Sequence, residues 1–199
     1  MSGFVKATEN IYRLKIPFES VYTSVFLVKC SEGAIIVDAA TTDFDVDTYI
    51  VPALSELGVG IGELYGIVIT HDHSDHAGGL KRILEKFPDL KVIKNGDITF
   101  ADIDIYPLKG HTEDFVGVFD RRSKTLISGD GIQGAGIGRY RCMLANKAGY
   151  RQTLAKIEAD PLVENLLFSH EYEPWYKDHV FGREAVIECV NECKKYIGD

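Results

Sequence analysis

The residues of this chain whose types and spacing favour chemistry are concentrated between positions 70 and 79, which read Thr-His-Asp-His-Ser-Asp-His-Ala-Gly-Gly. Three histidines and two aspartates fall within the six positions from His71 to His76. Neutral imidazole nitrogens and carboxylate oxygens are the usual ligands of zinc and of other borderline divalent metals. A polar turn capped by Asp and Ser is the alternative interpretation, but it does not account for three histidines. The pattern therefore predicts a metal site.

The elements on either side indicate how this cluster is positioned. An apolar run over residues 64–69 leads into it and is typical of a buried strand. Apolar residues then recur at steps of three and four over residues 80–87, a spacing typical of an amphipathic helix. The cluster is thus predicted to lie on a strand-to-helix loop, where open α/β sheets tend to place their sites.

Within the loop, the spacing separates two pairs of candidate ligands. His71 and His73 are two apart on extended backbone and can converge on one ion through a bend. Asp75 and His76 come at the start of the helix and can face a second ion. The motif His71-x-His73-x-Asp75-His76 resembles the signature of the metallo-β-lactamase superfamily, and the resemblance extends over nearly the whole chain.

The resemblance implies an α+β fold, the four-layer αββα sandwich, and we expect residues 1–199 to form a single domain of this kind. It also implies three more ligands in the order His, Asp, His, each following a strand. The candidates are His111, after the alternating stretch 103–108, Asp130, in Ser-Gly-Asp-Gly, and His170, at the end of the run 165–170.

By the same resemblance, the seven ligands form two sets joined by one carboxylate. Asp130 is implied to bridge two ions. The first ion takes His71, His73 and His111, and the second takes Asp75, His76 and His170. Asp38 follows an apolar stretch, and the matching Asp in this family supports the metal loop without binding the metal.

The implied cofactors are two divalent metal ions, Zn²⁺ in the first place, with Fe or Mn also fitting such a site. The leading hypothesis is hydrolysis of an ester, thioester, lactone or amide of a small molecule by a metal-bound hydroxide, as in the glyoxalase II-like and lactonase-like branches. A metal lowers the pKa of its water from about 15.7 to about 7. Asp75 is the candidate catalytic residue, which orients the water and takes up its proton.

A second hypothesis is redox chemistry on the same fold, by a non-haem iron oxidoreductase of the persulfide dioxygenase or flavodiiron type. Flavodiiron proteins usually carry Glu at the second position of the motif, so His73 argues against that branch. The dioxygenase motif is nearly the same as the present one and stays open. A metal-bound binding module without turnover is a third, weaker reading because the ligand set is complete.

Composition limits the partners. The formal net charge of −8 over 199 residues repels phosphate backbones, so nucleic acid is not expected as a partner and a small-molecule substrate is. No apolar run reaches the 18 or so residues of a membrane helix, so no membrane is expected. The first residues lack an apolar signal core, so we expect a cytoplasmic protein rather than a secreted lactamase. An oligomer is compatible with the sequence.

The remaining predictions concern secondary structure and substrate contacts. We expect a turn at 17–20, a last strand over 165–170, and a closing helix with Tyr196 inward and Cys189 packed against Cys193. The predicted strands are 10–16, 21–28, 34–38, 64–69, 90–93, 103–108, 115–119, 125–128 and 165–170, and the predicted helices are 45–57, 80–87, 147–159 and 182–197. Candidate substrate contacts, left open, are Phe18, Tyr22, Arg139, Tyr140 and Arg141.

Overall fold

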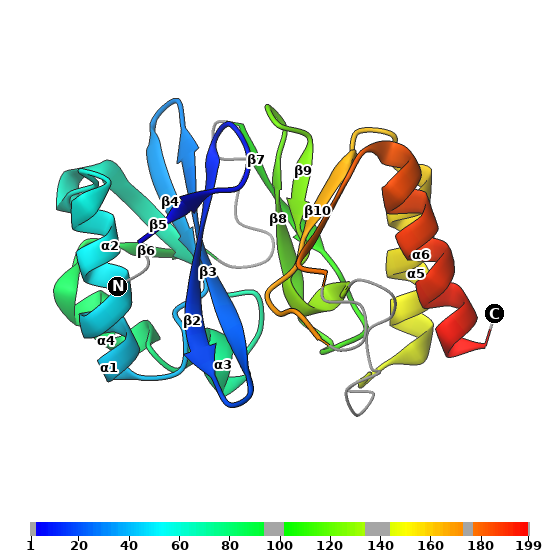
Figure 1. Ribbon diagram of the computed structural model, residues 1–199, viewed down its shortest axis with the longest axis horizontal. Helices are drawn as coiled ribbons and strands as arrows, with labels where there is room; N and C mark the ends of the chain where they lie inside the picture. Colours follow the sequence, from blue (N-terminus) through cyan, green and yellow to red (C-terminus); the bar gives the residue numbers. More distant parts are fainter. Residues whose placement is uncertain (1–2, 94–101, 134–143, 173–176, 199) are drawn as a thin grey trace. The chain divides into compact units, whose positions relative to one another are not determined.

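The computed structural model describes residues 3–93, 102–133, 144–172 and 177–198. The chain forms two compact units, unit 1 (Met1–Asp102) and unit 2 (Ile103–Asp199). Each unit consists of one sheet with helices packed on it (Figure 1). The candidate substrate contacts Arg139, Tyr140 and Arg141 lie outside the described residues. The single domain predicted from the sequence stays a prediction.

Unit 1 is built on a six-stranded sheet in the order β1-β2-β3-β4-β5-β6. The first four strands pair antiparallel, whereas β4, β5 and β6 run parallel. The strands are β1 (Val5–Lys6), β2 (Ile11–Phe18), β3 (Val21–Cys30), β4 (Gly33–Val37), β5 (Leu64–Val68) and β6 (Lys91–Ile93). The helical segments are α1 (Asp43–Asp45), η1 (Val46–Ile50), α2 (Val51–Glu56), η2 (Ile61–Glu63), α3 (Ser74–Ala77) and α4 (Leu80–Lys86).

The helix expected over 45–57 is present, but it is not a regular α-helix. It begins at Asp43, where the Thr42 side chain accepts a hydrogen bond from the backbone N–H of Asp45. A π-helical turn, η1, separates α1 from α2, and Pro52 lies in the first turn of α2. Because proline has no N–H and its ring crowds the preceding turn, a regular α-helix cannot run through it. The helix ends before Gly58, whose φ is +70°.

The hairpin between β2 and β3 is tighter than predicted. Pro17 and Phe18 pair with Tyr22 and Val21 in the ladder, so the turn contains only residues 19 and 20 rather than 17–20. Pro17 is tolerated because β1 pairs only with Tyr12 and Arg13, which leaves this end of β2 at the edge of the described sheet.

Unit 2 is built on a five-stranded sheet in the order β11-β10-β9-β8-β7. The strands are β7 (Ile103–Pro107), β8 (Val116–Asp120), β9 (Thr125–Ile127), β10 (Asn165–Leu167) and β11 (His179–Phe181). Strands β9 and β10 are parallel, and the other pairs are antiparallel. The prediction of a last strand over 165–170 is wrong in two respects: β10 ends at Leu167, and β11 follows it.

The helical segments of unit 2 are η3 (Gly129–Gly131), α5 (Lys147–Ala159) and α6 (Arg183–Ile197). Helices α5 and α6 lie side by side on one face of the sheet (Figure 1). Tyr150, Leu154 and Ile157 of α5 are buried there, as predicted. In the part of the chain that the structure describes, no helix combines the length and apolar character needed to span a membrane.

The buried stripe of α6 consists of Val186, Cys189, Val190, Cys193 and Ile197. Tyr196 was expected on this stripe but is 37% exposed, because it is one residue, or about 100° of helical rotation, away from Ile197. The predicted packing of Cys189 against Cys193 is confirmed. A hydrogen bond with Cys193, together with burial, raises the pKa of the Cys189 thiol.

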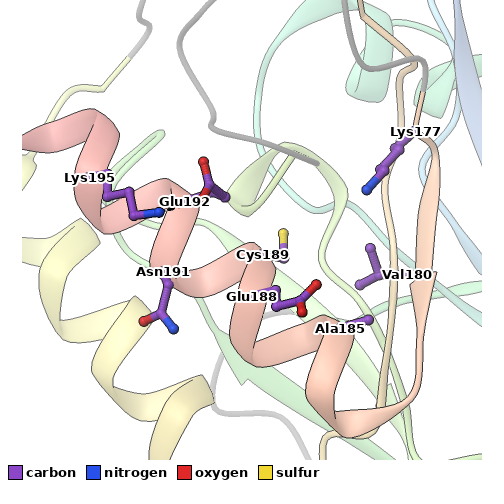
Figure 2. A pocket seen from close by; sticks show the side chains of 8 residues that line it. All are labelled: Lys177, Val180, Ala185, Glu188, Cys189, Asn191, Glu192 and Lys195. Carbon is purple, nitrogen blue, oxygen red and sulfur yellow. Dashed lines mark hydrogen bonds and ion pairs between the residues drawn. The ribbon is translucent and has the colours of Figure 1, made fainter.

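A pocket of about 390 Å³ lies beside α6, with Cys189 and Val180 at its inner side. Figure 2 shows that its other lining residues include Lys177, Glu188, Glu192 and Lys195. Lys195 is bound to Glu192, with 2.7 Å between Nζ and Oε1. The raised pKa favours the protonated form of the Cys189 thiol, which is the less nucleophilic form.

Candidate metal centre

The histidine-rich motif lies on the loop between β5 and α3, as predicted. The parallel strand β5 ends at Val68, and His73 is the N-cap of α3 with φ −66° and ψ 147°. His73 is therefore on extended backbone and His71 lies between β5 and α3, whereas Asp75 and His76 lie in the first turn of the helix. His71, Asp75 and His76 are buried, and His73 is half-buried.

The side chains of this loop converge within unit 1. The imidazole rings of His71 and His73 have centroids 4.4 Å apart, and those of His71 and His76 are 4.2 Å apart. His76 Nε2 lies 3.2 Å from Asp75 Oδ2. The loop thus gathers three imidazoles and a carboxylate in one place, which is the donor set that a divalent metal requires.

Asp38 supports this loop from the end of β4, and the supporting role predicted for it is confirmed. Its Oδ1 accepts from the backbone N–H of Thr70 at 2.8 Å, and its Oδ2 accepts from the Thr70 hydroxyl at 3.0 Å. The Nδ1 atom of His76 lies 2.7 Å from the same Oδ2. The carboxylate is fully buried. It therefore braces both the start of the loop and the helix that follows it.

The backbone around Asp38 is strained. Asp38 has φ +67° and Ala40 has φ +58°, in the left-handed region that residues other than glycine rarely adopt. The segment nevertheless pairs with the motif loop, because Ala39 N–H donates to His76 C=O at 2.7 Å and Gly79 N–H donates to Ala40 C=O at 3.2 Å. Backbone strain of this kind persists where many surrounding contacts hold the strained conformation, and it is most often found at functional sites.

Close backbone approach explains the glycines after the motif. A Cβ atom on Gly79 would lie 2.2 Å from Ala39 O, and one on Gly78 would lie 2.0 Å from Thr41 O. On the other side, the Thr23 hydroxyl in β3 donates to Asp75 C=O at 3.1 Å. The loop is thus held between the Asp38 segment and β3.

Unit 2 brings its three predicted ligands together from three different loops. His111 follows β7, Asp130 lies in η3 directly after β9, and His170 follows β10. Strands β7, β9 and β10 point the same way, since β7 and β9 are both antiparallel to β8 and β10 is parallel to β9. Their carboxyl ends therefore meet at one edge of the sheet.

The Asp130 carboxylate lies between two imidazoles. Its Oδ1 is 3.2 Å from His170 Nε2, and its Oδ2 is 3.6 Å from His111 Nε2. All three side chains are buried. Each oxygen thus faces a different histidine, which is the disposition expected of a carboxylate that serves two cations.

Backbone contacts position these three residues. Gly110 has φ +142° and accepts at its carbonyl from Asn146 N–H at 3.0 Å. Ser128 N–H donates to Leu167 C=O at 2.9 Å, which ties the end of β9 to the end of β10. In the loop after His111, Glu113 accepts a hydrogen bond from the Asn146 side chain at 3.0 Å.

The other residues considered from the sequence have simpler places. His179 lies on β11 beside Asp178, outside the ligand cluster of unit 2, with its side chain 49% exposed. Phe18 and Tyr22 are half-buried in the β2–β3 hairpin, and the Lys15 ammonium lies 4.3 Å from the Tyr22 ring centroid. Their contact with substrate stays a prediction.

Thr70 has a place in the site that was not predicted from the sequence, although it is the first residue of the motif stretch. Its hydroxyl is bonded to Asp38 and lies 3.0 Å from His71 Nδ1. A hydroxyl residue directly before the first histidine of a metal motif could have indicated this role. A metal-bound histidine commonly donates a hydrogen bond from its second ring nitrogen, and such a hydroxyl can accept it.

The comparisons with known proteins agree with this architecture. Residues 20–102 match the family model of the metallo-beta-lactamase superfamily, a stretch that contains the motif from His71 to His76. The family model specifies no branch of the superfamily. His111, Asp130 and His170 lie beyond the matched residues.

Solved structures resemble the chain over nearly its whole length. A metallo-β-lactamase from Erythrobacter litoralis, with β-mercaptoethanol in its active site, has a TM-score of 0.69 at 21% identity, covering 96% of each chain. The metallo-β-lactamase FIM-1 from Pseudomonas aeruginosa, in its mono-zinc form, has a TM-score of 0.74 at 16% identity, covering 98% of this chain and 96% of its own. A metallo-β-lactamase from Pontibacter korlensis has a TM-score of 0.65 at 17% identity, covering 94% and 98%.

Identities this low establish the fold and leave the substrate open. The chain has the metallo-β-lactamase fold, and the resemblance to the metallo-β-lactamase superfamily predicted from its motif is confirmed.

Proposed function

We propose that this protein is a metal-dependent hydrolase that binds two divalent ions, with zinc as the first metal to test. The observation that carries the proposal is the gathering of ligand-type side chains at one loop of unit 1 and at one sheet edge of unit 2. The proposed ligands are His71, His73, Asp75, His76, His111, Asp130 and His170. Imidazole and carboxylate donors without a thiolate suit zinc, iron and manganese.

The two ligand sets are those that the family resemblance implies, and the donors that lie together within each unit are compatible with them. His71 and His73 have ligand atoms within 4.8 Å of each other, as do Asp75 and His76. We assign the first pair to one ion, completed by His111, and the second pair to the other ion, completed by His170. Asp130 would bridge them, because a carboxylate offers two oxygens and its charge offsets the repulsion between two cations.

When bound, the divalent ions would supply Lewis acidity and a nucleophilic water of lowered pKa. The chain supplies the proton acceptor. Asp75 is buried, its backbone C=O accepts from the Thr23 hydroxyl, and its Oδ2 lies 3.2 Å from His76 Nε2, so the carboxylate lies beside a proposed ligand of the same ion. We assign Asp75 the roles of orienting the attacking water and of taking up its proton.

The proposed substrate is a small molecule with an ester, thioester, lactone or amide bond, because each has a carbonyl that a nucleophilic water can attack. The net charge of −8 disfavours a polyanionic substrate such as nucleic acid. The mono-zinc form of FIM-1 supports zinc as the starting metal, and the lactamases among the similar structures add β-lactams to the compounds to test.

The first experiment is elemental analysis of protein purified without added metal, with and without exclusion of oxygen. We expect about two zinc ions per chain and hydrolysis of some members of a panel of thioesters and lactones. The variants His71→Ala and Asp130→Ala should each lose metal and this hydrolytic activity. His179→Ala is the matched control, because it removes an exposed imidazole from unit 2 and should keep the full metal content.

The outcomes separate the hypotheses. Iron together with oxygen consumption would replace the hydrolase by the non-haem iron oxidoreductase considered from the sequence. Protein that binds no metal under either condition, even after zinc is added, would overturn the ligand assignment.

A further inference from the structure

Thr70 lies at the junction of a buried hydrogen-bonded chain in unit 1. Its hydroxyl is 3.0 Å from Asp38 Oδ2 and 3.0 Å from His71 Nδ1, and His76 Nδ1 is 2.7 Å from the same Asp38 oxygen. All four side chains are buried, and Asp38 and His76 are completely so. A single carboxylate is thus connected to two of the proposed metal ligands, to one directly and to the other through a hydroxyl.

The number of available protons determines which groups donate and which accept in this series of hydrogen bonds. An ionised carboxylate only accepts hydrogen bonds, whereas a threonine hydroxyl has one proton to donate. Because the Thr70 proton goes to Asp38, the Thr70 oxygen can only accept from His71. The proton of neutral His71 must therefore be on Nδ1. The same reasoning applies directly to His76, whose Nδ1 faces the carboxylate.

We propose that Thr70 is a positioning residue, which transmits the charge of Asp38 to His71 and holds its imidazole in the Nδ1–H tautomer. The Nε2 lone pairs of both His71 and His76 are then available for metal before any metal arrives. This inference rests on the proposed function, because it concerns two of the proposed ligands. It adds that the Asp38 carboxylate sets the tautomer of one proposed ligand of each ion, His71 of the first and His76 of the second.

The direct test uses the metal-free protein. Long-range ¹H–¹⁵N correlation spectra, recorded at a pH where the imidazoles are neutral, distinguish the two tautomers of each histidine. In the unaltered protein we expect the Nδ1–H tautomer at His71 and His76. In Thr70→Val, which keeps the shape but has no hydroxyl, His71 should become a mixture of tautomers while His76 is unchanged. Thr70→Ser should restore the original spectrum.

Metal affinity gives the second readout. Loss of a supporting partner of a metal-bound histidine typically weakens metal binding about 10- to 100-fold. We expect that loss of zinc affinity for Thr70→Val in a chelator competition, and near-normal affinity for Thr70→Ser and for the His179→Ala control. The denaturation midpoints of the metal-free variants are compared first, so that a general loss of structure is recognised.

The results distinguish this inference from the proposed function. An Nε2–H tautomer at His71 in the unaltered protein would overturn the role of Thr70 without any variant, even if zinc binds normally. An unchanged His71 spectrum in Thr70→Val would do the same. Failure of the unaltered protein to bind metal would instead overturn the proposed function, while the tautomer spectra would still decide the role of Thr70.

Discussion

The two units present the same donor types but acquire them differently. In unit 1, four of the proposed ligands lie within six consecutive residues, on the single loop between β5 and α3. In unit 2, the three proposed ligands come from loops after β7, β9 and β10, and almost sixty residues separate His111 from His170. A short loop brings neighbouring residues together by itself, whereas distant residues meet only through the order of the strands.

The supports differ as well. In unit 1, side chains hold the ligands, since Asp38 and Thr70 bond to the imidazoles of His76 and His71. In unit 2, backbone hydrogen bonds connect the loops, as between Ser128 and Leu167 and between Asn146 and Gly110, and the Asn146 side chain adds a hydrogen bond to Glu113. A substitution that removes one supporting side chain should therefore affect the two units unequally, whereas removal of a ligand should affect them alike.

The largest expected effect is loss of a ligand from either unit. His71→Ala in unit 1 and His111→Ala in unit 2 should each lower metal affinity and hydrolytic activity by more than about 100-fold, because even loss of a supporting partner costs about 10- to 100-fold. Metal content after dialysis and activity at matched zinc concentration measure this. If only the unit 1 variant loses metal, His111 does not belong to the site.

Closely packed glycines give the next largest effect. A Cβ atom on Gly79 would lie 2.2 Å from Ala39 O, and one on Gly110 would lie 2.6 Å from Tyr150 Cβ. Overpacking typically costs about 1–3 kcal/mol, so Gly79→Ala and Gly110→Ala should lower the free energy of unfolding by such amounts. Urea denaturation of metal-free protein measures it. Gly62→Ala is the control, because no atom of the described residues lies within 4 Å of the position that its methyl group would take.

Helix caps allow a smaller, matched comparison of the two units. The Thr42 side chain accepts from Asp45 N–H at 3.2 Å in unit 1, and the Asn146 side chain accepts from Gly149 N–H at 2.8 Å in unit 2. Replacing either by Ala should cost about 0.5–2 kcal/mol. Asn146→Ala should also lower activity, because it removes the side chain that donates to Glu113 in the loop after His111. Equal activity of both variants would contradict this.

The smallest expected effect concerns surface charge in unit 1. Hydrogen bonds from Arg82 and Lys86 hold the pKa of Asp47 below its usual value. The stabilisation from such a carboxylate is complete above its unfolded-state pKa and is lost as the pH falls through its folded-state pKa. Asp47→Asn should therefore slightly lower Tm at neutral pH and leave it unchanged in strong acid, with a difference that salt reduces. A Tm deficit that persists in strong acid would show a different cause.

Secondary structure was predictable where one physical factor dominates. The limits of α5 agree with the predicted 147–159, because its apolar residues recur regularly and Asn146 caps it. The prediction failed where tertiary contacts compete with local preference. The run 165–170 looks like one strand, but β10 pairs only over Asn165–Leu167, and Phe168 N–H then donates to Asp178 C=O.

The sequence by itself determined the chemistry of the candidate site. The types and order of His71, His73, Asp75 and His76, and the loop that carries them, follow from local spacing, because a strand, a turn and the first turn of a helix place residues two to five positions apart close together. The family resemblance added His111, Asp130 and His170 by their order along the chain.

Only the tertiary structure decided how those ligands are supported. The contact of Asp38 with His76, the Thr70 hydroxyl between Asp38 and His71, and the disposition of Asp130 between two imidazoles all join residues far apart in the sequence or depend on side-chain directions. Such contacts arise from strand order and from the close approach of backbone at Gly79, which no local pattern of residues specifies.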